Sequence, residues 1–416
     1  MNKENGLQRV IIENMYPEIN HGKFPVKRIK NEEVLVKADI FTDSHDVITA
    51  SVHFKHEEDD KWSKTKMELL VNDRWKGEFT VAKTGRYFYT IEAWIDHFAT
   101  WHRDIMKRID AEVVTHTDFL QGAEMLEKIK KSASGREVDY LQELIAKLRN
   151  EEIFPAEKKH LLQKKELLIL AGAYPQKTFV TRYDKELPVW VDREKARFST
   201  WYELFPRSVN SDGQQHGTFK DLIEHLPCVQ EMGFDVLYLP PIHPIGETNR
   251  KGKNNSLKAE PGDVGSPWAI GNKDGGHKSV HPRLGTISDF EALVKAANEK
   301  GVEIALDIAL QCSPDHPYLK EHPAWFRIRP DGSIQFAENP PKKYEDIVPF
   351  NFETEHWKEM WEELLSIFIF WIKKGVKIFR VDNPHTKSLI FWEWCIAEIK
   401  KRHPHLLFLG GAFTRT

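Results

Sequence analysis

The chain of 416 residues is long enough for two or three domains that each bury a core. Its formal net charge is -3, so it lacks the basic excess that nucleic-acid binding or an electrostatic membrane anchor needs. Three cysteines, Cys228, Cys312 and Cys395, are too few for a disulfide framework and favour a reducing, cytoplasmic setting. The first 20 residues lack the apolar core of a signal peptide, and the longest apolar run, 364–372, is far shorter than the roughly 20 residues of a membrane span, so we expect a cytosolic protein.

Residues 1–115 predict a β-sandwich. In 85–96, GRYFYTIEAWID, every second residue from Tyr87 to Ile95 falls on one face of a strand, which is the period of two that a sandwich strand shows. From 116 to 182 the period changes to that of helices, with Leu141, Leu144 and Leu148 on one face. These helices are interpreted either as an insert in the sandwich or as a linker bundle.

Residues 183–416 alternate between strand and helix patterns. Strands are predicted within 198–206, 235–242, 302–310, 376–382 and 406–413, with a helix after each of the first four. For the second helix, Ser288 and Glu291 form a capping-box signature and Gly301 a stop. Such units imply parallel strands, which either an open doubly wound sheet or a (β/α)8 barrel would satisfy.

Two long loops, 243–287 and 311–352, follow the second and third of these strands. Active sites of (β/α)8 barrels are built from loops at this end, so the loops favour the barrel. Four βα units and a fifth strand are present in the sequence. The predicted fold is therefore multidomain: a β-sandwich with a helical insert, then the first half of a TIM barrel.

The segment 375–387, GVKIFRVDNPHTK, is the densest group of chemically active residues. Arg380 and Asp382 are two apart on a predicted strand, so their side chains point to the same side, and the guanidinium favours the charged form of the carboxylate. An ionised Asp at the C-terminal end of a barrel strand is placed to act as a nucleophile, although a structural ion pair explains the spacing equally well. Five histidines fit no compact ligand set by spacing, so we expect no metal: His243, His277, His281, His316 and His385.

This segment resembles the nucleophile motif of the α-amylase superfamily, and Asn-Pro-His after the Asp is similar to one branch, the α-1,4-glucan:maltose-1-phosphate maltosyltransferases. The same likeness runs through 196–208, 232–271, 275–286, 310–317 and 337–352. The resemblance implies a retaining transfer of maltosyl from α-maltose 1-phosphate to the non-reducing end of an α-1,4-glucan, with phosphate released. It also implies a cytoplasmic homodimer that needs no cofactor or metal.

The resemblance assigns roles to single positions. Asp382 matches the nucleophile and Arg380 the residue that orients it; Asp307 and His385 match supporting residues. Residues that match the lining of the donor pocket are Lys251, Gln311, Asn339, Tyr344 and Asn383. Amides, a cation and a phenol suit this task, because they form hydrogen bonds with sugar hydroxyls and anionic oxygens.

The motif on the fifth strand departs from the family. Where relatives have Leu-Ala-Glu-Ala-Phe-Thr-Arg-Pro, this chain reads LGGAFTRT, which puts Gly411, 29 residues after Asp382, at the position of the acid/base Glu. Losing a positioned general acid/base typically costs about 10² to 10⁴ in rate. The chain also ends where relatives continue, so we expect a truncated, impaired member of the family. The alternatives are a non-catalytic glucan-binding or dimerisation module and the N-terminal half of a split enzyme.

Overall fold

The computed structural model describes residues 6–210 and 215–413, and the chain divides into two compact units, Met1–Val191 and Asp192–Thr416. Within the described ranges, no helix is both long enough and apolar enough to cross a membrane.

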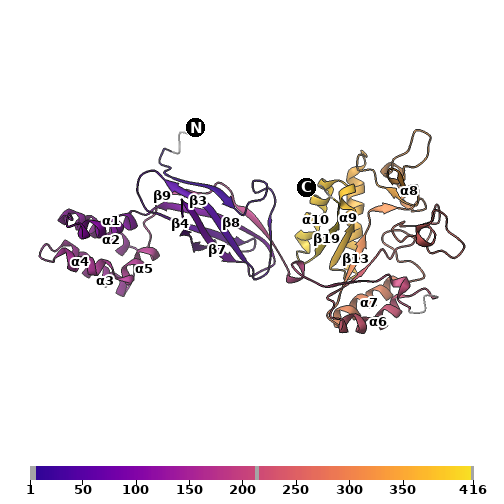
Figure 1. The fold of residues 1–416 in the computed structure, drawn as a ribbon, viewed down its shortest axis with the longest axis horizontal. Helices are drawn as coiled ribbons and strands as arrows, with labels where there is room; N and C mark the ends of the chain where they lie inside the picture. The colour runs from indigo at the N-terminus through magenta and orange to yellow at the C-terminus, as the bar shows by residue number, and fades with distance from the viewer. Residues whose placement is uncertain (1–5, 211–214, 414–416) are drawn as a thin grey trace. The chain divides into compact units, whose positions relative to one another are not determined.

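The first unit contains a sandwich of antiparallel strands (Figure 1). Its strands are β1 (Val10–Tyr16), β2 (Val26–Ile29), β3 (Glu33–Thr42), β4 (Ile48–His56), β5 (Ser63–Lys66), β6 (Glu68–Leu69), β7 (Arg74–Thr80), β8 (Gly85–Ile95), β9 (Thr178–Arg182) and β10 (Leu187–Asp192). One sheet has the order β1-β3-β7-β6 and the other the order β2-β10-β8-β4-β5, with β9 pairing β8. Alternate residues of β3 and β8 face a shared core, as the period of two predicts.

Five helices lie between β8 and β9 in the chain, so they are an insert in the sandwich. They are α1 (His97–Asp110), α2 (His116–Lys130), α3 (Arg136–Arg149), α4 (Pro155–Leu162) and α5 (Lys165–Ala173). The boundaries differ from 1–115 and 116–182: the helical part begins at His97, and the sandwich resumes with β9 and β10. Asp96 starts α1 directly after β8 by accepting a hydrogen bond from Ala99 N at 2.8 Å, a capping signal that the predicted boundary overlooked.

The second unit holds a five-stranded sheet with the order β11-β12-β13-β18-β19, in which every neighbouring pair is parallel. The strands are β11 (Trp201–Glu203), β12 (Val236–Leu239), β13 (Glu303–Ile308), β18 (Ile378–Asp382) and β19 (Leu407–Gly411). The helices that connect them are α6 (Phe219–Glu231), α7 (Ile287–Glu299), α9 (Trp357–Lys373) and α10 (Leu389–Arg402). The four predicted βα units and the fifth strand are confirmed.

Side chains on the helix side of this sheet form the main core of the second unit. Leu237, Leu306 and Phe379 point from three neighbouring strands into it and are fully buried, as is Trp371 of α9. The opposite side of the sheet carries a smaller cluster around Tyr238 and Ala305. The three central strands, β12, β13 and β18, are thus buried on both sides, which explains why they read as continuous apolar runs rather than as alternating ones.

The start of α7 corrects one expectation. Thr286, and not Ser288, caps the helix: its N–H donates to Asp289 Oδ2 at 2.9 Å and its Oγ1 accepts from Asp289 N at 3.2 Å. The same spacing of three residues occurs two positions earlier than predicted, directly after Gly285, whose φ of +129° suits glycine. At the other end Gly301 adopts a φ of +75°, as the predicted stop requires.

The two long loops contain short elements of their own. These are β14 (Gln311–Cys312) with β17 (Val348–Pro349), the hairpin of β15 (Ala337–Asn339) and β16 (Lys342–Tyr344), and α8 (Tyr318–Glu321). Hydrogen bonds join the two loops: Asp315 Oδ2 accepts from the N–H groups of Glu247 and Thr248 at 2.6 and 2.7 Å.

Candidate active site

The strand register brings the predicted catalytic residues to one edge of the sheet. Asp307 on β13 lies opposite Arg380 on β18, and Asp382 on β18 lies opposite Gly411 on β19. Arg380 Nη1 donates to Asp307 Oδ2 at 2.9 Å and to Asp382 Oδ1 at 2.7 Å. The guanidinium therefore fixes both carboxylates with one nitrogen.

Asp307 is held in a fully buried position. Its Oδ2 also accepts from the hydroxyl of Tyr238 on β12 at 2.5 Å, whereas its Oδ1 is buried with no hydrogen-bond partner among the described residues. Burial raises the pKa of Asp307 to about 7, and the Asp382 charge adds to this, although the hydrogen bond from Tyr238 and the charge of Arg380 oppose it. Burial next to this carboxyl also raises the pKa of Tyr238. The sequence analysis did not single out Tyr238. Its position at the end of β12, the strand that pairs with β13, is the feature that indicates a contact with Asp307.

The second oxygen of Asp382 is held by the residue that follows it. Asn383 adopts a left-handed conformation with φ 42°, which Asn tolerates better than most residues, and its Nδ2 donates to Asp382 Oδ2 at 3.1 Å. Its carbonyl accepts from Lys387 Nζ at 3.2 Å. Burial lowers the pKa of Lys387 to about 8, against the opposing influence of Asp382 and Asp307. Sequence reasoning missed Lys387, which reaches this place because the chain turns back after Asn383.

The side chain of Arg380 fills the space beside Gly411. A Cβ atom at this position would lie 2.4 Å from Arg380 Nη2, so the guanidinium occupies the space where a side chain would begin. His385 lies beside the end of β19, where its Nδ1 accepts from Phe413 N at 3.3 Å. The residues expected as nucleophile and orienting group thus meet with the supporting Asp307, whereas His385 contacts Phe413 after the end of β19. The position expected for the acid/base lies beside Arg380.

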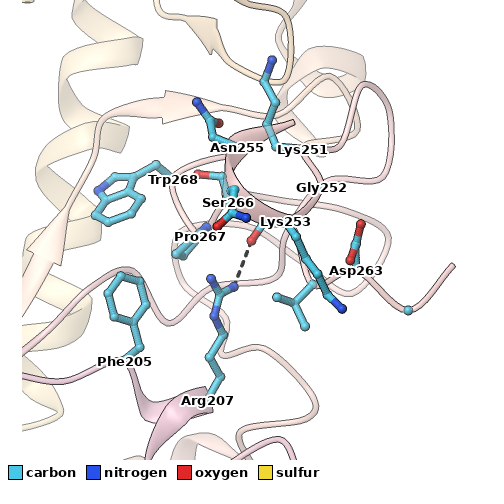
Figure 2. A pocket seen from close by; sticks show the side chains of 14 residues that line it. Phe205, Arg207, Lys251, Gly252, Lys253, Asn255, Asp263, Ser266, Pro267 and Trp268 are labelled. Carbon is cyan, nitrogen blue, oxygen red and sulfur yellow. Dashed lines mark hydrogen bonds between the residues drawn. The ribbon is translucent and has the colours of Figure 1, made fainter. Parts of the chain in front are cut away.

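A cavity of about 540 Å³ lies in the first long loop beside Lys251, one of the residues expected in the donor pocket. Figure 2 shows Arg207 pointing into it beside Phe205 and Trp268. Its lining further includes Lys251, Lys253, Asn255 and Asp263. Gln311 adjoins it, because its Nε2 donates to the carbonyl of Trp268 at 3.2 Å.

Asp346 is a further polar group near Lys251 that sequence reasoning missed. It is 2% exposed, and its Oδ1 has no hydrogen-bond partner in the described part of the chain. Burial raises its pKa, and the charge of Lys251 acts in the opposite direction. Asn339 and Tyr344 lie on the β15–β16 hairpin, with Asn339 exposed and Tyr344 half-buried. Neither side chain forms a hydrogen bond with any described residue, so this structure does not join them to the Asp382 cluster.

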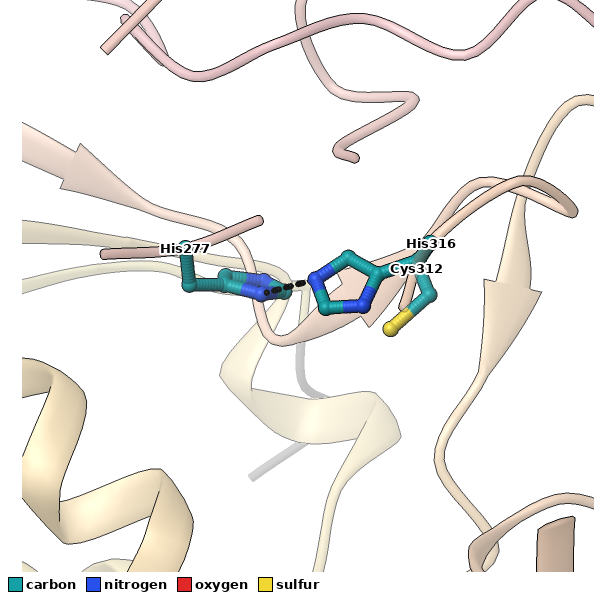
Figure 3. A group of neighbouring side chains, drawn as sticks. All are labelled: His277, Cys312 and His316. Atoms are coloured by element: carbon teal, nitrogen blue, oxygen red, sulfur yellow. Dashed lines mark hydrogen bonds between the residues drawn. The ribbon is translucent and has the colours of Figure 1, made fainter. Parts of the chain in front are cut away.

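Three side chains with potential metal-binding atoms meet in the buried base of the loops: His277, Cys312 and His316 (Figure 3). Their ligand atoms lie within 4.8 Å of one another, a proximity that the sequence spacing did not predict.

Hydrogen bonding accounts for this cluster. Tyr318 N donates to His316 Nδ1 at 3.1 Å, so a neutral His316 carries its proton on Nε2 and donates to His277 Nδ1 at 3.1 Å. His277 in turn donates from Nε2 to the carbonyl of Ala309 at 2.9 Å. Burial lowers the pKa of His277 to about 4 and of His316 to about 2, so both rings stay neutral, and every ring nitrogen has a partner. A metal ion would have to compete with these bonds for its ligand atoms.

Comparison with known proteins covers both units. Residues 8–193 match the model of the α-1,4-glucan:maltose-1-phosphate maltosyltransferase domain N/S, and residues 203–364 match that of the α-amylase catalytic domain. The maltosyltransferase of Chlorobaculum tepidum is 50% identical over 410 residues, which are 99% of this chain and 61% of the relative. A maltosyltransferase of Cereibacter sphaeroides is 45% identical over 407 residues, which are 98% of this chain and 68% of the relative. This chain belongs to the α-1,4-glucan:maltose-1-phosphate maltosyltransferase family.

The chain spans about three fifths of the length of several maltosyltransferases that it matches. Among solved structures, an α-amylase from Lactobacillus plantarum matches 52% of this chain and 46% of its own length, with 29% identity and a TM-score of 0.44. The maltosyltransferase relatives, and not this partial likeness, decide the family.

Proposed function

We propose that this chain performs the first half of a retaining maltosyl transfer, taking the maltosyl group from α-maltose 1-phosphate onto Asp382. The supporting observation is the position of Asp382, whose two oxygens are held by Arg380 at 2.7 Å and Asn383 at 3.1 Å at the C-terminal edge of the sheet. A carboxylate fixed at both oxygens loses little orientational freedom when it attacks, which is how positioning lowers a barrier.

The bonds change in two steps. An Asp382 oxygen attacks the anomeric carbon from the face opposite phosphate, the bond to the phosphate oxygen breaks, and a β-linked glycosyl-enzyme forms. A hydroxyl of the acceptor then attacks the same carbon, loses its proton to a base and displaces Asp382, which restores the α configuration. Phosphate leaves with little protonation, so the first step tolerates glycine at 411. The second step needs a base that Gly411 does not supply, and we expect it to be slow.

The test is a reaction with α-maltose 1-phosphate, without acceptor and with maltohexaose. We expect a burst of about one phosphate per chain and an increase of about 324 Da on the peptide containing Asp382, because the glycosyl-enzyme forms faster than it breaks down. The Asp382→Asn variant, which keeps the size of the side chain, should give neither signal. Absence of both phosphate and adduct from the unaltered chain would contradict the proposal.

The wider properties of the family extend this proposal. We propose α-1,4-glucan as the acceptor, a homodimer as the assembly and the cytoplasm as the location; the relatives are α-1,4-glucan:maltose-1-phosphate maltosyltransferases, which supports the substrates. Elongation of maltohexaose by two glucose units and sedimentation of the purified chain at two protein concentrations test the acceptor and the assembly.

A further inference from the structure

The chain turns back on itself directly after Asp382. Asn383 adopts left-handed backbone angles, φ 42° and ψ 54°, ahead of the short helix η6 (Pro384–Thr386). Its carbonyl accepts from three donors: the N–H of Thr386 at 3.2 Å, the hydroxyl of Thr386 at 2.9 Å and Nζ of Lys387 at 3.2 Å. Left-handed angles are unfavourable for a residue with a side chain, so these bonds are needed to hold Asn383 in place.

This turn determines where the side chain of Asn383 lies. With the backbone in this conformation, Asn383 Nδ2 donates to Asp382 Oδ2 at 3.1 Å, while Arg380 Nη1 donates to Oδ1 of the same carboxylate at 2.7 Å. One oxygen of Asp382 is thus fixed from within β18 and the other from the turn. A change of the Asn383 backbone angles would move its Cβ atom, and with it the amide, relative to Asp382.

Lys387 is the charged member of the three donors. Burial lowers its pKa to about 8, although the negative charges of Asp382 and Asp307 act in the opposite direction. Within the ranges 6–210 and 215–413, the Asn383 carbonyl is the only hydrogen-bond acceptor of its Nζ. Attraction to the two carboxylates thus favours an ammonium group beside the turn, and burial opposes it.

We propose that Lys387 is a positioning residue for the maltosyl transfer: its ammonium group holds the Asn383 carbonyl, and thereby the turn that presents the Asn383 amide to Asp382. The inference rests on the proposed function. The protonated lysine is the form that acts, because a neutral amine is a weaker donor and is not attracted to the carboxylates. Positioning of Asp382 should therefore weaken as the pH rises through about 8.

The rate of the phosphate burst from α-maltose 1-phosphate, measured between pH 6 and pH 10, tests this role. The unaltered chain should lose rate as the pH rises through about 8. Lys387→Arg, which stays protonated throughout, should keep most of the rate at pH 7 and extend it to higher pH. Lys387→Met, which has no donor, should lower the burst rate about 10- to 10²-fold at pH 7 with an unchanged half-saturating donor concentration. Lys295→Met, at a lysine whose side chain is 80% exposed on α7, should behave like the unaltered chain.

The comparison isolates residue 387. The other titratable groups around Asp382 are the same in Lys387→Arg and in the unaltered chain: Asp307, Tyr238, Arg380 and His385. Helix α10 contributes the uncharged Trp392, whose Nε1 donates to the Pro384 carbonyl at 2.9 Å. A loss of rate at the same pH with Lys387 and with Arg, or an undiminished burst in Lys387→Met, overturns the inference and leaves the proposed function standing.

A titration of Lys387 itself needs no turnover. In a chain with ¹³C-labelled lysine, the Cε resonance that Lys387→Arg removes should titrate near pH 8. Asp382→Asn should lower this midpoint, because it removes one of the two charges that favour the ammonium group. If no protein gives a burst, the proposed function fails; an unchanged midpoint in Asp382→Asn then overturns the link between Lys387 and Asp382 as well, whereas a lowered midpoint supports it. The titration and the Lys387→Arg profile decide the matter even if Lys387→Met does not fold.

Discussion

Buried Asp307 controls how the site responds to pH. Its pKa in the folded chain is raised to about 7, whereas a free aspartate titrates near 3.8, because the carboxyl is fully buried and one of its oxygens lacks a donor. Between these values the folded state holds a proton that the unfolded state has lost. Stability from this residue is therefore complete below about pH 4 and is lost as the pH rises through 7.

Replacing Asp307 by Asn should remove this pH dependence. An amide keeps an oxygen for Tyr238 and Arg380 and cannot ionise, so the variant should lose less stability than the unaltered chain between pH 4.5 and 7.5. The measurement is the thermal midpoint of the second unit at both pH values. Asp289→Asn, at an exposed helix cap, is the control and should leave the pH profile between these values unchanged. Equal pH profiles for Asp307→Asn and the unaltered chain would contradict the assignment.

The sequence predicted only part of the site at the residue scale. Spacing within one strand placed Arg380 and Asp382 on the same side, and the structure shows this ion pair. Tyr238 was missed because its contact with Asp307 depends on the register between two strands 69 residues apart in sequence. Lys387 was missed because its return toward Asp382 depends on the left-handed turn at Asn383.

At the scale of elements, helix α1 packs closely against α2 through a glycine. A Cβ atom at Gly122 would lie 1.9 Å from Cζ2 of Trp101, whose indole N–H donates to the carbonyl of Asp118 at 2.8 Å. The Trp ring is thus fixed by a hydrogen bond and cannot move aside without breaking it. This contact explains why a helical insert with a strong apolar period also contains a glycine in the middle of a helix.

Gly122→Ala should destabilise the helical insert by up to about 2 kcal/mol, because overpacking typically costs about 1–3 kcal/mol and outweighs the gain in helix propensity of about 1 kcal/mol. Gly172 on α5 is the matched control, since a Cβ there meets nothing within 4 Å. Gly172→Ala should stabilise the insert by about 0.5–1 kcal/mol. Urea unfolding of the chain, followed by circular dichroism at 222 nm, separates the two; a stabilising Gly122→Ala would contradict the packing argument.

The element boundaries show what a pattern alone cannot fix. The strand of 85–96 was predicted from its alternation with a period of two, and the parallel strands 302–310 and 376–382 were predicted from their apolar runs. The start of the insert at His97 was not predicted, because Phe98, Trp101 and Ile105 follow a strand with no intervening turn. Only the tertiary return of β9 and β10 to the same sheet shows that the helices interrupt the sandwich.

On the scale of the whole molecule, the sheet of the second unit is open at β19. In the described ranges this strand pairs with β18 alone. Exposed apolar side chains lie near this end of the sheet: Phe413 after β19 is 82% exposed, and Leu389 and Ile390 at the start of α10 are 73% and 62% exposed. An unpaired strand edge beside exposed apolar groups favours association with another chain.

We therefore expect a polypeptide of these 416 residues to associate with itself at micromolar concentrations through the β19 and α10 region. Leu389→Glu with Ile390→Glu should shift it toward monomer, because two carboxylates replace the apolar pair and are tolerated at a helix N-terminus. The matched control is Leu168→Glu with Ile169→Glu on α5, which replaces an adjacent pair with 46% and 60% exposure in the first unit. Sedimentation velocity over a concentration series gives the distribution. Association that persists equally in both double variants, or a chain that is monomeric throughout, would show that this edge is not where chains meet.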